Sequence, residues 1–219
     1  MANRPVYVPM VKSESCGVIV KGVEFKWFPG MSKSQKQKSI ISLHDAAAKL
    51  DISPILEISS KSKLELGVKL SAFNLMITTK KQKSFSVETA FQGSKVFENG
   101  GPYIDLLDGT SREAKKDIRL KESGNLIKFK FFSKEFLLEP RTSFYDWIYI
   151  NALHKDKELS EQIMSYSSFT DIEFNPKKSI NCQAYSAALY VSLREAGVLE
   201  KALESFESFT EVLSTEYKN

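Results

Sequence analysis

The stretch "SVETAFQGSKVF", residues 86–97, has the pattern of an amphipathic helix that follows a polar turn. Ser84 or Ser86 can act as its N-cap. Apolar and small side chains then recur at helical spacing on one stripe: Val87, Ala90, Phe91, Ser94 and Phe97. An adjacent stripe carries Glu88, Gln92 and Lys95. Either this stripe is a solvated face with Glu88 stabilising the first turn, or it is the wall of a site.

The residues before this helix predict strands and one further helix. Residues 17–28 alternate β-branched or aromatic with polar side chains, which predicts one or two strands ending at the Pro29–Gly30 turn. A helix capped by Ser32 or Ser34 should follow. Its expected apolar face comprises Ile40, Leu43, Ala47 and Leu50. Residues 53–59 predict a buried strand, and residues 71–81 predict another that ends in the polar turn "KKQKS".

The residues after it complete an α+β pattern. A Gly-Gly-Pro break at 100–102 precedes a broken helical pattern in "REAKKDIRLKES", a β-hairpin pattern over 125–140 and a buried helix over 142–154. A short helix over 157–166, an edge strand from 169 and a helix over 180–197 with Gly197 as its C-cap are expected next. We therefore predict one domain over residues 1–219, mainly helical with a small sheet.

Composition narrows the class of protein. The chain has 219 residues, 42% of them hydrophobic, and a formal charge of +4. No apolar run of about 18 residues and no secretory signal pattern is present, which favours a soluble cytoplasmic protein without a membrane partner. Two cysteines and two histidines are too few for a structural zinc site, and no Gly-rich phosphate loop occurs.

Cations offer one set of candidate binding residues. In "KKDIR", Lys115 and Arg119 are four residues apart, so both can face a diphosphate from one side of a helix. A solvated surface is the alternative interpretation. Lysines in "KKQKS" and "SSKSK" could also contact nucleic-acid phosphates, although neither segment carries interleaved aromatic residues.

Polar and aromatic residues near the last long helix are further candidates. Asp171, Glu173 and Asn175 alternate along the predicted edge strand. Asn181 and Gln183 lie at the start of the following helix, where Asn181 is either a cap or a ligand contact. Trp147, in an apolar helix, is either a core residue or a platform for a nucleobase.

Two motifs together resemble the NADAR superfamily. "LSAFNL" (70–75) followed by "SVETAFQGSKVF" is similar to the family's L-S-N-F segment and its S-x-E-x-x-x-Q-x-x-K helix. "SREAKKDIRL" and "INCQAYSAALYVSLREAG" are similar to two later family helices, so the core resemblance spans 66 to about 197. The family-specific part, residues 1–65, with "EFKWFPGMSKSQKQKSI" and "SPILEISSKS", looks like the branch that accompanies DarT-type DNA ADP-ribosyltransferase toxins as antitoxins.

The resemblance implies an activity and a site. The activity is removal of ADP-ribose from guanine bases in DNA, by hydrolysis of the bond between the ribose anomeric carbon and the base nitrogen, without a cofactor. The expected partners are ADP-ribosylated DNA, the product ADP-ribose and a DarT-type toxin. The catalytic candidates are Glu88, which matches the family's glutamate, and Asp171. The expected substrate-binding residues are Gln92, Lys95, Lys115, Arg119, Trp147, Glu173, Asn175, Asn181 and Gln183.

Two alternatives stay open from the sequence. The chain departs from the family pattern at "DIEFNPKKSIN", where the family commonly has a Trp-Gly loop, so the roles expected of Asp171, Glu173 and Asn175 do not rest on a matched motif. The superfamily also includes N-glycosidases that act on riboflavin-pathway intermediates, and the same motifs are compatible with that substrate. A module that binds ADP-ribose or sequesters a partner toxin without catalysis is the third interpretation.

Overall fold

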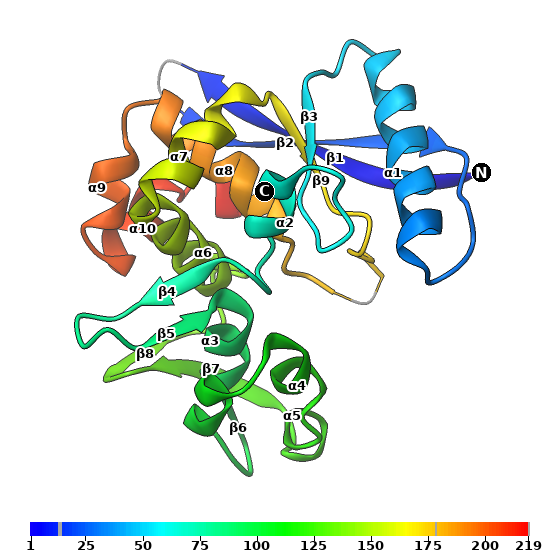
Figure 1. Ribbon diagram of the computed structural model, residues 1–219. Helices are drawn as coiled ribbons and strands as arrows, with labels where there is room; N and C mark the ends of the chain where they lie inside the picture. The colour runs from blue at the N-terminus through cyan, green and yellow to red at the C-terminus, as the bar shows by residue number, and fades with distance from the viewer. Residues whose placement is uncertain (13–14, 178, 219) are drawn as a thin grey trace.

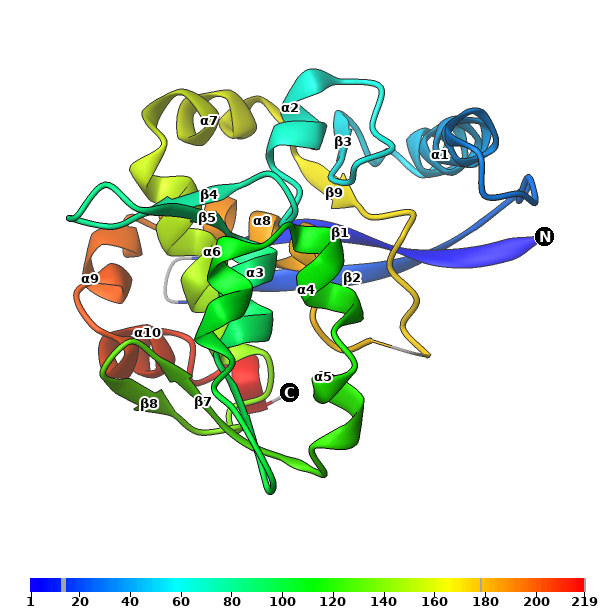
Figure 2. The same ribbon diagram turned by 60° about the horizontal axis from the view of Figure 1, so that its bottom comes forward.

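The fold has three tiers in the view of Figure 1, and Figure 2 shows the same fold turned so that the lower tier comes forward. A computed structural model describes residues 1–12, 15–177 and 179–218. A four-stranded sheet lies at the top of Figure 1, long helices lie beneath it, and two small sheets with short helices form the bottom. The predicted α+β class is confirmed.

The four-stranded sheet has the order β2-β1-β9-β3. Its strands are β1 (Ala2–Lys12), β2 (Ser15–Phe25), β3 (Ile55–Glu57) and β9 (Ser168–Thr170). β1 and β2 form a long antiparallel hairpin, and β3 pairs with β9 in parallel. β9 is thus an inner strand, so the predicted edge position is wrong: Pro176, which suggested an edge, lies well beyond the end of β9. β1 was not predicted because it contains Pro5 and Pro9; prolines fit here because β1 meets β9 only at Tyr7↔Phe169.

One helix covers the N-terminal part of this sheet. α1 (Lys33–Ala48) begins at the predicted cap, where the Ser32 hydroxyl accepts a hydrogen bond from the Gln35 backbone N–H. Its buried face packs against the hairpin in a small apolar cluster of its own: Val6, Val23, Phe25, Ile40, Leu43, Ala47, Ile52 and Ile172. Apolar spacing alone therefore identified this helix and three residues of its buried face. Leu50, the fourth predicted residue, lies beyond the end of α1 and is exposed, so that part of the prediction is wrong.

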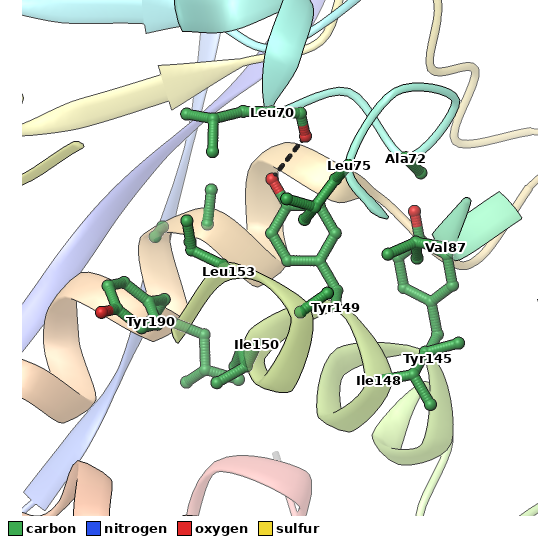
Figure 3. Close-up of a cluster of buried hydrophobic side chains, with 14 of the residues drawn as sticks. Leu70, Ala72, Leu75, Val87, Tyr145, Ile148, Tyr149, Ile150, Leu153 and Tyr190 are labelled. Carbon is green, nitrogen blue, oxygen red and sulfur yellow. Dashed lines mark hydrogen bonds between the residues drawn. The ribbon is translucent and has the colours of Figure 1, made fainter. Parts of the chain in front are cut away.

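The main core lies between α6 (Ser143–Lys155) and α8 (Gln183–Glu195). Small residues of α8, among them Ala184, Ala187 and Ala188, are fully buried and let the two helices approach closely. Figure 3 shows the buried Tyr149 of α6, whose hydroxyl donates a hydrogen bond of 2.8 Å to the Leu70 carbonyl. This bond ties the "LSAFNL" segment to the core. Around the pair lie α7 (Lys157–Gln162), η2 (Ile163–Ser165), α9 (Leu199–Leu203), α10 (Phe206–Val212) and η3 (Glu216–Lys218).

The bottom tier carries the motif helix. Its strands are β4 (Met76–Thr78), β5 (Ser84–Ser86), β6 (Lys95–Phe97), β7 (Leu126–Phe131) and β8 (Lys134–Phe136). Its helices are α3 (Val87–Gly93), η1 (Ile104–Asp108), α4 (Ser111–Lys116) and α5 (Arg119–Glu122), while α2 (Glu65–Lys69) precedes the tier. The predicted hairpin over 125–140 and the broken helix over 112–123 are confirmed.

Two predicted boundaries in this tier are wrong. Only Met76–Thr78 of the expected strand over 71–81 is extended, because residues 71–75 form a tight turn in which the Leu75 N–H donates to the Ser71 carbonyl. The motif helix ends at Gly93, and the chain turns at once into β6. Lys95 consequently belongs to a strand, one side of which still faces the same cavity as α3.

Candidate active site

A cavity of about 800 Å³ opens between the bottom tier and the loop that follows β9. Its walls include parts of α3, β6, α4, the β8–α6 loop and α6, together with residues 171–175 and 179–183. The predicted site residues on these walls are Glu88, Gln92, Lys95, Lys115, Asp171, Glu173, Asn175, Asn181 and Gln183. Segments far apart in sequence therefore meet around one space, large enough for a nucleotide-sized ligand.

α3 brings Glu88 into the cavity wall. The Glu88 and Val87 backbone N–H groups donate to the carbonyls of Ala72 and Leu75, so the "LSAFNL" turn seats the first turn of the helix. Glu88 is only 5% exposed, and its Oε1 accepts a 3.0 Å hydrogen bond from the Gln92 side chain one turn later. The other amide atom, Gln92 Oε1, is buried without a hydrogen-bond partner among the described residues. A buried acceptor of this kind calls for a donor from a ligand or water.

Two lysines stand beside the Glu88 carboxylate. Lys115 Nζ of α4 lies 3.8 Å from Glu88 Oε1, and Lys95 Nζ lies 4.7 Å from the centre of the Phe91 ring. Burial lowers the pKa of Lys95 to about 8; the Glu88 charge opposes this shift and the Lys115 charge adds to it. The cavity therefore combines one carboxylate with two cations, a set of charges suited to an anionic ligand.

Asp171 and Gln183 form another part of the cavity wall. Asp171 Oδ1 accepts hydrogen bonds from the Glu173 and Phe174 backbone N–H groups, and Oδ2 accepts one of 3.0 Å from Gln183 Nε2. Gln183 also donates to the Ile58 carbonyl and accepts from the Ala72 N–H, both at 2.7 Å. Burial raises the pKa of Asp171, although these donors act against the shift. Gln183 thus holds three segments of the cavity wall in register.

A second buried carboxylate, which the sequence did not single out, stands behind Asp171. Glu57 of β3 is 2% exposed and accepts hydrogen bonds from the hydroxyls of Ser59 and Thr170 and from the Ile172 N–H. Burial raises its pKa, and the nearby charge of Asp171 adds to the effect. His44 of α1 contacts the same Thr170 hydroxyl at 2.8 Å. The only signal of Glu57 in the sequence was that it is the one charged residue in the apolar segment "SPILEIS".

The loop after β9 carries the remaining predicted residues on the rim. The strand ends at Thr170, so Asp171, Glu173 and Asn175 lie on a turn instead of alternating along a strand. Glu173 forms a 2.9 Å ion pair with Lys36 of α1, and the Asn175 side chain accepts from the Lys177 N–H. Asn181 lines the cavity and is not the cap of α8, since Cys182 holds that position without a side-chain bond.

The structure places Arg119 away from the cavity, which corrects its prediction as a substrate-binding residue. It donates to Asp117 and Asp105, with Nη2–Oδ2 distances of 2.8 and 2.6 Å, and lies over the Tyr103 ring. The helix breaks between α4 and α5, so the four-residue spacing from Lys115 no longer puts both cations on one side.

Trp147 is the second correction. It packs between Phe136 and Phe206, with ring centres 5.7 and 5.9 Å away, and is not among the residues lining the cavity. Of the two interpretations, a core residue or a platform for a nucleobase, the structure agrees with the core residue. The aromatic residues that do line the cavity include Phe73, Phe91 and Tyr145.

Tyr145, which the sequence did not single out, also lines the cavity. It is 5% exposed, and its ring meets Phe91 edge to face at 5.1 Å. Burial raises the pKa of Tyr145 well above its ordinary value, and the Glu88 charge raises it further. The phenol therefore keeps its proton and is available as a donor. Arg141 and Thr142, on the β8–α6 loop, also line the cavity and carried no signal beyond following Pro140.

No set of three or more His, Cys, Asp or Glu side chains arranged to hold a metal ion occurs in residues 1–12, 15–177 and 179–218. Within the same residues, none of the helices has the length and apolar character needed to cross a membrane.

Comparison with known proteins identifies the family of the chain. A comparison with curated protein sequences gives no significant match. The family model described as "DarT1-associated NADAR antitoxin" matches residues 2–219, which is practically the entire chain. The chain therefore belongs to the family of DarT1-associated NADAR antitoxins.

Proposed function

We propose that this protein hydrolyses the N-glycosidic bond between ADP-ribose and guanine in DNA, and thereby acts as the antitoxin to a DarT-type ADP-ribosyltransferase. The observation that carries the proposal is the buried Glu88 carboxylate in the cavity wall, with Lys95 and Lys115 beside it. Family membership supports the antitoxin part.

The reaction passes through a positively charged, oxocarbenium-like sugar. Glu88 is assigned two tasks: its negative charge stabilises the developing charge on the anomeric carbon, and it accepts a proton from the attacking water. Gln92, which donates to Glu88, keeps the carboxylate oriented. The water oxygen forms the new bond to carbon as the bond to guanine breaks.

The departing guanine nitrogen takes the bonding electron pair and needs a proton. Asp171 is the proposed donor, because burial raises its pKa and its turn holds it at the cavity wall. The protonated phenol of Tyr145 is available to hydrogen-bond a sugar or base oxygen. After release, the proton gained by Glu88 returns to Asp171 through solvent, so that no cofactor is consumed.

The substrate's diphosphate is assigned to the cationic side of the cavity. The Lys115 side chain is 58% exposed and Lys95 is half-buried, so the two lysines extend from the mouth of the cavity toward its interior. Lys95 Nζ lies 4.7 Å from the centre of the Phe91 ring, and Lys115 Nζ lies 5.1 Å from the centre of the Phe73 ring. These cation–ring contacts keep both ammonium groups in place. Holding the phosphates here would set the anomeric carbon against Glu88.

The test is release of ADP-ribose from an oligonucleotide that carries one ADP-ribosylated guanine. We expect Glu88→Gln, which keeps the size of the side chain, to lower the rate by about 10²- to 10⁴-fold. The matched control is Glu200→Gln, since Glu200 is exposed and its only ion pair among the described residues is with His154. Glu88→Gln as active as the control would refute the mechanism.

The same assay separates the rival functions. Turnover of a riboflavin-pathway intermediate, with no release from modified DNA, would assign the cavity to a small metabolite. Tight binding of ADP-ribose by calorimetry, with no product from either substrate over hours, would make the protein a binding module instead.

A further inference from the structure

A group of aromatic and basic side chains surrounds the loop between β2 and α1. The Arg4 guanidinium carbon lies 5.3 Å and the Lys36 Nζ 5.1 Å from the centre of the Trp27 ring. Lys26 Nζ lies 5.2 Å from the centre of the Phe28 ring. We name these five residues the Trp27 surface. Cation–ring contacts of this kind hold each positive charge in a defined place.

Part of this charge has no acidic partner. Among the described residues, neither Arg4 nor Lys26 forms an ion pair with a carboxylate, whereas Lys36 does. The Nε atom of Arg4 is buried and has no hydrogen-bond partner in the described part of the chain. Met31, in the same loop, is 86% exposed. Unpaired cations beside exposed apolar area are the features of a surface that takes an anionic, partly aromatic polymer.

The Trp27 surface adjoins the mouth of the cavity. Lys36 pairs with Glu173 at 2.9 Å, and Glu173 lines the cavity. One residue later on α1, Gln37 donates to the Lys61 carbonyl, next to the cavity residue Ser60. α1 therefore touches two segments of the cavity wall, and a chain leaving the mouth on this side would meet the Trp27 surface.

We infer that the Trp27 surface binds the phosphates of the DNA strand next to the modified guanine. The inference rests on the proposed function, and it assigns to the N-terminal part a role that the cavity itself does not need: selecting a nucleotide within a strand over a free nucleoside. Nucleic acid fits better than an acidic protein surface because the cations are interleaved with the aromatic rings of Trp27 and Phe28.

The test compares two substrates and one double variant. Wild type and Arg4→Gln/Lys26→Gln are assayed on free ADP-ribosylated guanosine and on a single-stranded oligonucleotide with one ADP-ribosylated guanine. We expect kcat/KM on the oligonucleotide to fall about tenfold at low salt, and the slope of log kcat/KM against log salt to lose about 1.4, since each phosphate contact to a single strand contributes about 0.7. Activity on the nucleoside should stay unchanged.

Two control variants test whether a loss of activity comes from the Trp27 surface and not from removing any surface lysine. Lys201→Gln removes an exposed lysine on α9, which lies at the opposite end of the molecule from α1 in both Figure 1 and Figure 2. It should leave both slopes unchanged. Lys26→Arg, which keeps the charge, should retain the wild-type salt slope. Circular dichroism melts establish that each variant is folded.

The outcomes separate this inference from the proposed function. Equal salt slopes for wild type and the double variant would overturn the inference while leaving the hydrolase intact. If wild type acts on neither substrate, the proposed function fails, and binding of an unmodified fluorescent oligonucleotide still tests the surface: unchanged affinity in the double variant refutes it. A double variant that binds DNA normally but no longer binds the DarT-type toxin would assign the surface to that protein and overturn the inference.

Discussion

Removing the Gln183 amide should loosen the cavity wall by a calculable amount. Gln183→Met keeps the length of the side chain and deletes three hydrogen bonds, at 2.7 Å to the Ala72 N–H, 2.7 Å to the Ile58 carbonyl and 3.0 Å to Asp171. At about 1 kcal/mol net for each bond, the loss is about 3 kcal/mol. Gln183 is only half-buried, so water would satisfy some of the groups left behind. We therefore expect the free energy of unfolding to fall by about 2 kcal/mol.

The expected loss in free energy of unfolding can be measured as a decrease in melting temperature. For a chain of 219 residues, about 2–4 °C are lost per kcal/mol, so the expected decrease is about 4–8 °C. Thermal melts followed by circular dichroism, with urea titrations as an independent measure, would give both quantities. The change should also raise the pKa of Asp171 further, because the Gln183 hydrogen bond lowers it.

The control is another glutamine in a helix. Gln162→Met, on α7, removes one hydrogen bond to Glu158 at an exposed position and should change stability by no more than about 0.5 kcal/mol. If Gln183→Met melts within about 1 °C of this control, the three hydrogen bonds do not hold the wall and the argument for Gln183 fails.

Three further predictions follow from the charges. Because the pKa of Lys95 is lowered to about 8, its positive charge is lost as pH rises through that value; ADP-ribose affinity measured by calorimetry should decline from pH 7 to pH 9.5, and Lys95→Met should be weak throughout with a flatter profile. Arg119→Gln should bind ADP-ribose within about twofold of wild type, since the guanidinium is committed to Asp105 and Asp117; a tenfold loss would return Arg119 to the site. The pKa of Glu57 is raised in the folded state, so the protonated side chain stabilises the fold. This stabilisation is complete below the ordinary carboxyl pKa and is lost as pH rises through the pKa of Glu57 in the folded protein. Urea titrations at pH 5, 7 and 9 should record declining stability, with a smaller decline in Glu57→Gln, and an unchanged decline would place the effect elsewhere.

The sequence predicted the start of the motif helix and the place of Glu88 in it because local signals specify them, whereas the predicted end of the helix was wrong. The Ser86 cap, the apolar stripe and the position of Glu88 and Gln92 all depend on residues within a few turns of one another. The same holds for α1 and for the β7–β8 hairpin. Lys95 lines the cavity as predicted, but from strand β6 and not from the motif helix on which it was expected.

The wrong predictions concern contacts between residues far apart in the sequence, which only the tertiary structure shows. Arg119 has the right spacing and charge, but Asp117 and Asp105 attract its guanidinium elsewhere. Trp147 is one of several aromatic residues on an almost fully apolar helix, and nothing in the sequence tells which of them faces the cavity. The inner position of β9 depends on pairing with β1 and β3, far away in sequence. The family resemblance supplied the grouping of the cavity residues that periodicity could not.

The bonds of Gln183 also bear on the order in which the molecule is built. Its partners Ala72 and Ile58 are 111 and 125 residues away along the chain, and β9 closes against β3 over a similar span. Contacts of such long range form late, because ordering the intervening chain costs entropy before the contacts compensate for it. The hairpin of β1 and β2 needs no such closure. On the ribosome both strands of the hairpin would therefore emerge long before the residues that complete the cavity, and any activity of the cavity would begin only once α8 had been synthesised and docked.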